Sequence, residues 1–129
     1  MDIEDPYIRV HHQIQNFLRL CELLIKRCKS LTSISLLTTK AANQASFEEQ
    51  SGKLNELKSD LSKNYSITLN VTYSDSLHDR EIRIVPSGWI IKIGRGLDIY
   101  KPAIGKTVIG QYDFDLRPCL ETTIDIFKL

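Results

Sequence analysis

Residues 8–28 carry the clearest structural pattern in the chain and read IRVHHQIQNFLRLCELLIKRC. The apolar residues recur at steps of three and four, which puts them on one face of a helix. They are Val10, Ile14, Phe17, Leu18, Cys21, Leu24, Ile25 and Cys28. Residues 2–7, which contain Pro6, predict a short strand before this helix, and the β-rich residues 33–38 predict a buried strand after it. We therefore expect a strand–helix–strand unit at the start of the chain.

The remainder of the chain predicts one more helix and four more strands. Residues 47–62 carry a second apolar stripe, and residues 67–73 alternate between apolar and polar as a strand does. The segments 81–85 and 89–93 flank Pro86-Ser87-Gly88, a hairpin signal, and residues 122–127 predict a last strand. Two helices among these strands indicate an α/β fold with a mixed sheet and helices on its faces. At 129 residues, positions 1–129 are expected to form one domain.

The overall composition excludes several classes of protein. Lys and Arg number 17 and Asp and Glu 16, so the net charge is +1, which argues against a bulk nucleic-acid binder. The N-terminal residues do not resemble a secretory signal, and no apolar run approaches a membrane span, so we expect any membrane contact to be peripheral. The three cysteines, Cys21, Cys28 and Cys119, form no C-x-x-C pair, which favours structural thiols in an intracellular protein.

Positive and negative charges are distributed unevenly along the second half of the chain. Five basic residues and the single acid Asp98 lie between positions 83 and 106, whereas positions 107–125 hold four acids and only Arg117. Lys92 and Arg95 flank Gly94 in the basic part, where glycines would let backbone N–H groups approach a phosphate. This pattern favours an anion-binding face. The alternative is an ordinary solvated surface whose charges pair within the molecule.

His78-Asp79-Arg80 is the one candidate for a reactive site. The strand period puts His78 and Arg80 on the same face, where the imidazole could attack phosphorus while the cation holds the phosphate oxygens. A structural or capping histidine is the alternative. His11 and His12 have no carboxylate or cysteine at a metal-ligand spacing, so we expect no metal site there.

Five blocks of the chain resemble one known family. They are residues 4–9 (EDPYIR), 16–19 (NFLR), 78–83 (HDREIR), 88–98 (GWIIKIGRGLD) and 113–123 (DFDLRPCLETT). In this order they closely resemble the phospholipase-D-like domain found at the C-terminus of MIT-domain-containing proteins. The similarity covers nearly the whole chain and is weakest across residues 39–59 and 100–111.

The resemblance implies an α/β/α sandwich of the phospholipase D type with a mixed sheet. It also implies a cytoplasmic homodimer that binds phosphoinositide-containing membranes peripherally, at late endosomes or the midbody. In the family a separate MIT domain binds ESCRT-III subunits, and the parent protein acts in cytokinesis and abscission. We expect this chain to lack the MIT domain, and we expect no cofactor and no nucleic-acid partner.

The resemblance further implies a module without catalytic activity. Active phospholipase D enzymes carry His-x-Lys followed by Asp, whereas here Arg80 stands for the Lys and Val85 for the Asp, so His78 and Arg80 form a degenerate site. An arginine stays protonated and offers a planar fork suited to phosphate. We expect four or five of six cations to form the lipid-binding patch. The six are Arg80, Arg83, Lys92, Arg95, Lys101 and Lys106.

Two other functions remain open at this point. The first is a phosphodiesterase or nuclease of the phospholipase D superfamily that uses His78 from two subunits. The second is a protein-interaction domain whose partner contacts the acidic residues between Asp113 and Asp125.

Overall fold

The computed structural model describes all residues from 1 to 129, and its elements follow the predicted order. The helices are α1 (His11–Arg27) and α2 (Gln44–Tyr65), and a short 3-10 turn, η1 (Phe114–Leu116), lies between β5 and β6. The strands are β1 (Asp2–Glu4), β2 (Ser33–Thr38), β3 (Thr68–Tyr73), β4 (Glu81–Ile84), β5 (Trp89–Ile93) and β6 (Ile124–Lys128). Every predicted helix and strand is present. The largest difference is α2, which begins three residues before and ends three residues after the predicted bounds.

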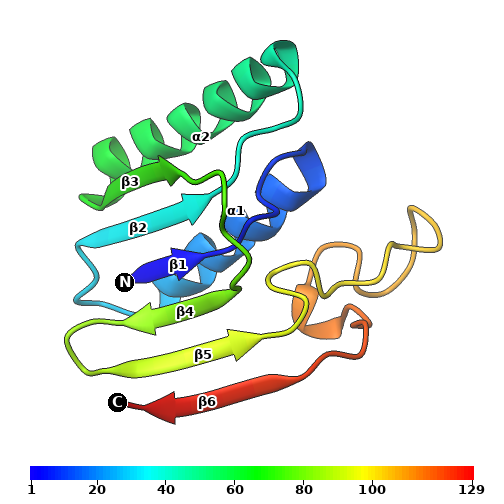
Figure 1. Ribbon diagram of the computed structural model, residues 1–129. Helices are drawn as coiled ribbons and strands as arrows, with labels where there is room; N and C mark the ends of the chain where they lie inside the picture. Colours follow the sequence, from blue (N-terminus) through cyan, green and yellow to red (C-terminus); the bar gives the residue numbers. More distant parts are fainter.

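The six strands form one mixed sheet in the order β3-β2-β1-β4-β5-β6 (Figure 1). β1, β2 and β3 are parallel, whereas β4, β5 and β6 each run antiparallel to the preceding strand of the sheet. The chain moves outward from β1 to β2 to β3 through α1 and α2, then returns to β4 on the other side of β1. The predicted α/β class with a mixed sheet is confirmed.

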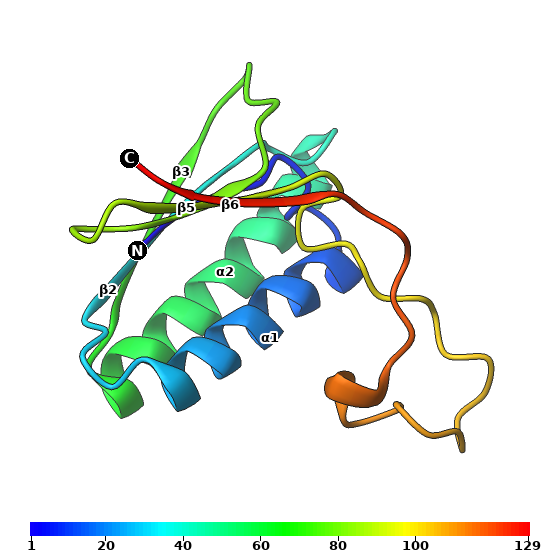
Figure 2. The same ribbon diagram turned by 90° about the horizontal axis from the view of Figure 1, so that it is seen from below.

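The layering differs from the three-layer sandwich that we expected. Both helices cover the same face of the sheet (Figure 2). The reason is topological, because two successive right-handed crossovers that step in the same direction leave their helices on one side. The other face carries polar residues such as Asp2, Ser35 and Asn70, which suit water. The molecule therefore has two layers.

The core lies between the helices and the covered face of the sheet. Ile3, Ile34 and Leu69 from the strands and Phe17 and Cys21 from α1 are at most 1% exposed. Alternation along each strand directs these side chains inward together. The predicted role of Cys21 as a small hydrophobe is confirmed, and burial raises the pKa of its thiol to about 12. Neither helix is long and apolar enough to cross a membrane.

A buried polar side chain ties α2 to the loops that follow β1 and β2. Gln50 is 1% exposed, and its amide donates to the carbonyl oxygens of Ile8 and Thr39, both at 2.9 Å. Its Oε1 accepts from the N–H of Ala41 at 2.8 Å. Gln50 thus satisfies three backbone groups at the end of the sheet where the parallel strands finish.

Candidate functional site

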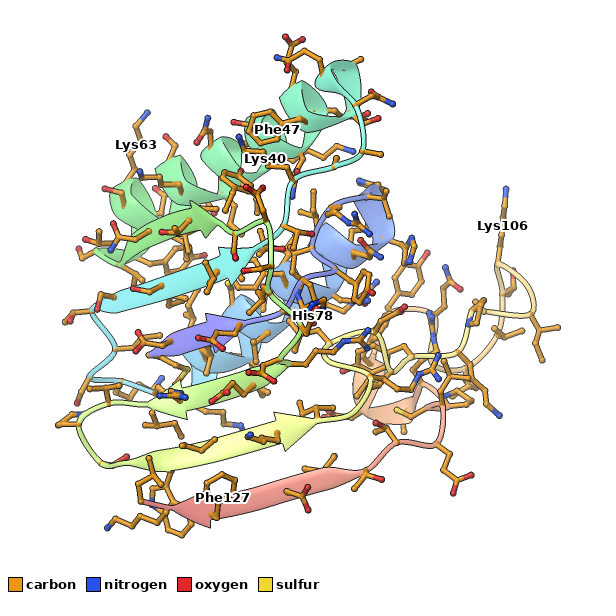
Figure 3. All side chains as sticks on the ribbon, viewed as in Figure 1. Lys40, Phe47, Lys63, His78, Lys106 and Phe127 are labelled. Atoms are coloured by element: carbon orange, nitrogen blue, oxygen red, sulfur yellow. The ribbon has the colours of Figure 1, made fainter.

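The parallel strands have their carboxyl ends on one side of the sheet, and the candidate residues gather at these strand ends. β1 is the point at which the strand order reverses, with β2 on one side and β4 on the other. In open α/β sheets, ligands bind outside the carboxyl ends of the strands at such a switch point. Three segments meet at this edge: residues 5–7 after β1, residues 78–80 before β4 and residues 94–98 after β5. Figure 3 shows His78 at this position.

A depression of about 350 Å³ opens beside His78. It is lined by His78, Asp79, Arg80, Lys92, Ile93, Gly94, Thr123 and Asp125. Sheet pairing explains the grouping, because Glu81 lies opposite Lys92 and Lys92 lies opposite Asp125. Of the predicted residues, the structure brings together His78, Arg80 and Lys92. Two carboxylates line the same depression, so its charge is mixed and a ligand would be held by its cationic side.

Arg80 is held in place by Gly94 and Tyr7, and its charge acts on the nearby Asp5. Asp5 is 2% exposed and accepts hydrogen bonds from the N–H groups of Tyr7 and Leu97, both at 2.9 Å. Burial raises the pKa of Asp5, and these hydrogen bonds and the charge of Arg80 oppose that rise. Arg80 donates from Nη1 to the carbonyl of Gly94 at 3.2 Å, and its guanidinium lies 4.4 Å from the centroid of the Tyr7 ring. Sequence reasoning assigned no role to Asp5, although an acid and a proline directly after a strand were a usable signal.

The predicted role of the glycines is wrong. The N–H of Gly94 donates to the Thr123 carbonyl at 2.9 Å, and that of Gly96 to the Ile93 carbonyl at 3.0 Å. The N–H of Arg95 donates to Oγ1 of Thr122 at 3.0 Å, so these groups are already used within the protein. Gly96 has φ of +61°, and a Cβ there would collide with the Asp5 carboxylate. Gly96 is therefore needed so that the Asp5 carboxylate can lie against the backbone of residue 96, and the glycines do not form a phosphate-binding loop.

The six predicted cations do not form one patch. Arg83 lies on the open face and donates from Nε to Oε2 of Glu81 at 2.6 Å. Arg95 is exposed and donates from Nε to the carbonyl of Asp98 at 3.3 Å. Lys101 and Lys106 belong to the long loop between β5 and β6, and Figure 3 shows Lys106 far from His78. Arg80 and Lys92 thus share the depression, while Lys101 and Lys106 lie on the loop. Arg83 and Arg95 belong to neither group.

Three carboxylates cluster next to the depression. Oxygens of Glu4, Asp79 and Glu81 lie within 4.8 Å of one another. Desolvation by burial raises the pKa of Glu4, and the charge of Glu81 raises it further. This acidic neighbourhood reduces the positive potential near Lys92, and Arg83 compensates part of it through its contact with Glu81.

The long loop is anchored to α1 by an aromatic ring between two arginines. The guanidinium carbons of Arg19 and Arg117 lie 3.6 and 4.3 Å from the centroid of the Phe114 ring, and Tyr100 packs edge-on against it at 4.7 Å. Desolvation by burial, followed by repulsion from Arg117, lowers the pKa of Arg19. Only the first part of the predicted acidic surface lies beside this stack, where Asp113 is exposed and accepts from the N–H of Asp115 at 3.0 Å. Asp125, at its other end, lines the depression instead.

Comparison with known proteins defines the class. Residues 1–128 match the family model described as the phospholipase D-like domain at the C-terminus of MIT, and the chain belongs to this family. The α/β fold with a mixed six-stranded sheet agrees with that class. A particular relative is MIT domain-containing protein 1 of the mouse, which is 51% identical over 125 residues and 97% of this chain. The match covers 49% of the mouse protein, so the chain spans about half the length of this relative.

Proposed function

We propose that this domain binds phosphoinositide-containing membranes and does not catalyse a reaction. The observation that carries the proposal is the depression at the switch point, where Arg80 and Lys92 face His78. His78 makes no hydrogen bond to a carboxylate that would orient its imidazole, as a general base of this kind requires. Val85, at the motif position of the catalytic acid, is 59% exposed and apolar. A site that holds a phosphate group without activating a nucleophile suits these residues best.

Electrostatic attraction alone would hold one domain on a membrane only weakly. Each Lys or Arg near an anionic leaflet contributes about 1 kcal/mol. Arg80, Lys92 and the neighbouring Arg95 would contribute roughly 3 kcal/mol, which is a millimolar-class affinity. A single domain therefore needs either a second copy on the same membrane or an additional contact.

The test is co-sedimentation with vesicles that contain a phosphatidylinositol phosphate. We expect the double variant Lys92→Glu and Arg95→Glu to lose binding. The matched control is Lys26→Glu with Arg27→Glu, which makes the same change in charge at the C-terminal end of α1, at the opposite edge of the sheet. Equal loss in both variants would mean that net charge alone matters. Unchanged binding by the first variant would refute the assignment of the site.

We infer that the domain forms a homodimer, and the edge strand β6 is the candidate interface. Thr123 and Leu129 direct their backbone groups toward β5, so by alternation those of Ile124, Ile126 and Lys128 point outward. Ile124 and Ile126 are 52% and 63% exposed on this edge. An edge of this kind favours antiparallel pairing with a second copy. Light scattering after gel filtration should report a dimer for the natural chain and a monomer for Ile126→Pro.

The link to ESCRT-III and to cytokinesis is proposed at the level of the whole relative. If the whole protein carries a MIT domain, as the name of the mouse relative indicates, that domain would supply the ESCRT-III contact, and this domain would supply the membrane contact. Separate deletion of each part, followed by recruitment to the midbody in dividing cells, tests this division. Recruitment that needs only the MIT part would contradict it.

The alternative function is a phosphodiesterase that uses His78 from two subunits. The observation in its favour is that Asp125 of β6 and Thr123, the residue just before β6, line the same depression as His78, which brings that depression next to the candidate dimer strand. Hydrolysis of a generic phosphodiester that is lost in His78→Ala would support this reaction. A dimer that binds vesicles but gives no turnover would exclude it.

A further inference from the structure

The long loop between β5 and β6 exposes an unusual set of apolar side chains. Ile104 is fully exposed, Ile109 is 82% exposed and Tyr112 is 92% exposed, and Val108 lies among them. We call Ile104, Val108, Ile109 and Tyr112 the apolar tip. Isolated exposed aliphatic residues are normal, but several within nine residues indicate a surface that contacts something apolar.

The base of the loop is firmly built. Arg117 donates from Nε to the carbonyl of Gly110 at 2.7 Å, from Nη2 to that of Gln111 at 3.2 Å and from Nη1 to that of Lys101 at 3.3 Å. One guanidinium thus joins both arms of the loop. The N–H of Lys101 donates to the Pro118 carbonyl at 2.9 Å, which extends the closure. These contacts fix the two arms of the loop and thereby hold the tip out in solvent. The base of the loop is in turn attached to α1 through the contact of Phe114 with Arg19.

The charge and shape of the loop suit a membrane surface. Between residues 99 and 112 the only charged side chains are those of Lys101 and Lys106, and no acid occurs. The loop projects beyond the sheet in both views, and Lys106 lies at its outer end (Figures 1, 2 and 3). It extends from the same edge that holds His78, Arg80 and Lys92. A convex tip that combines aliphatic side chains, a tyrosine and lysines matches the chemistry of the lipid interface, where apolar groups enter the acyl boundary and cations meet anionic headgroups.

We propose that the apolar tip inserts into the lipid interface when the domain binds a membrane. This inference rests on the proposed function. Since the electrostatic affinity of one domain for a membrane is only millimolar-class, an additional contact is needed, and the apolar tip would supply it. Arg80 and Lys92 would recognise a phosphate group, while the tip would add an apolar contribution that salt does not screen. Raised salt should therefore weaken binding without abolishing it.

The test uses the fact that the chain has one tryptophan. Trp89 begins β5 at the opposite edge of the sheet, so its fluorescence in the natural chain serves as the control. The reporter variant combines Trp89→Phe with Ile109→Trp, which moves the only tryptophan to the tip. Vesicles of phosphatidylcholine, phosphatidylserine and a phosphatidylinositol phosphate are prepared with and without bromine on the acyl chains. We expect a blue shift and quenching by the brominated lipids for the reporter, and neither for Trp89.

A second pair of variants measures the contribution of the tip. Ile104→Ser with Ile109→Ser should lower the vesicle partition coefficient about tenfold or more, with no change in the thermal unfolding midpoint. The matched control, Leu23→Ser with Val85→Ser, removes other exposed aliphatic surface and should bind as the natural chain does.

The outcomes separate the inference from the proposed function. Vesicle binding without quenching of the tip tryptophan would overturn insertion and leave membrane binding in place. No vesicle binding by the natural chain at any lipid composition would overturn both. Loss of self-association in the Ile104→Ser and Ile109→Ser variant, with vesicle binding retained, would show that a second copy covers the tip, which also overturns insertion.

Discussion

Replacement of Gly96 by alanine is the most informative single change at the site. Gly96 has φ of +61° and lies against the carboxylate of Asp5, which accepts the N–H of Leu97 at 2.9 Å. A Cβ at this position would collide with that carboxylate and would come within 2.9 Å of Cδ of Arg80. Gly96→Ala should therefore destabilise the fold and displace Arg80.

The expected magnitude follows from two contributions. A residue other than glycine in the left-handed region costs about 1–2 kcal/mol. Moving Asp5 away breaks a buried hydrogen bond to the carboxylate and leaves a polar group unpaired, which costs about 1–3 kcal/mol. The free energy of unfolding should fall by about 2–5 kcal/mol, a large part of the about 5–15 kcal/mol typical of such domains.

Urea unfolding measures this change, and a second glycine provides the control. Gly52 lies within α2 and a Cβ there would meet nothing within 4 Å. Gly52→Ala should stabilise the protein by about 0.5–1 kcal/mol, because alanine is the better helix former. With a slope of about 2 kcal/mol per M, Gly96→Ala should lower the urea midpoint by about 1–2.5 M, and Gly52→Ala should raise it.

A change of less than about 0.5 kcal/mol in Gly96→Ala would refute the reasoning, since that is the range of ordinary surface substitutions. It would mean that neither the Asp5 carboxylate nor Cδ of Arg80 lies against residue 96. The structure predicts that Gly96→Ala lowers the free energy of unfolding and that Gly52→Ala raises it.

Three further predictions concern buried groups. Gln50→Ala leaves three backbone groups without their partner and should cost about 2–4 kcal/mol in urea unfolding, whereas a change below 1 kcal/mol would contradict its role. Cys119 is exposed and should react with a thiol reagent at pH 8 well before Cys21, whose thiol has a pKa of about 12. Burial raises the pKa of Asp5 above its ordinary 3.8, so the folded state binds this proton more tightly; unfolding free energy should fall as pH rises through that range, and Asp5→Asn should flatten the slope in urea titrations.

The site illustrates why local sequence reasoning reached some residues and missed others. His78 and Arg80 could be paired from their spacing, because two positions along an extended chain share a face. Asp5 and Gly96 are 91 positions apart, and nothing in either segment indicates that they touch. The interpretation of this segment as a phosphate cradle failed for this reason, since the partners of the N–H groups of Gly94 and Arg95, at Thr123 and Thr122, come from the other end of a long loop.

The elements themselves were predictable, because they depend on periodicities of two and 3.6 residues that the order of residues alone establishes. Phe17 and Cys21 recur on one helical face, and Ile67 and Leu69 alternate along a strand. The fold class, the order of the helices and strands, and the buried face of each element could therefore be assigned. Which cations share a surface could not be assigned in this way. Lys92 meets Arg80 through the pairing of β4 with β5, whereas Lys106 is carried away by a loop whose course depends on Arg117 and Phe114. Charge can be counted along the chain, but where it gathers depends on contacts between distant segments.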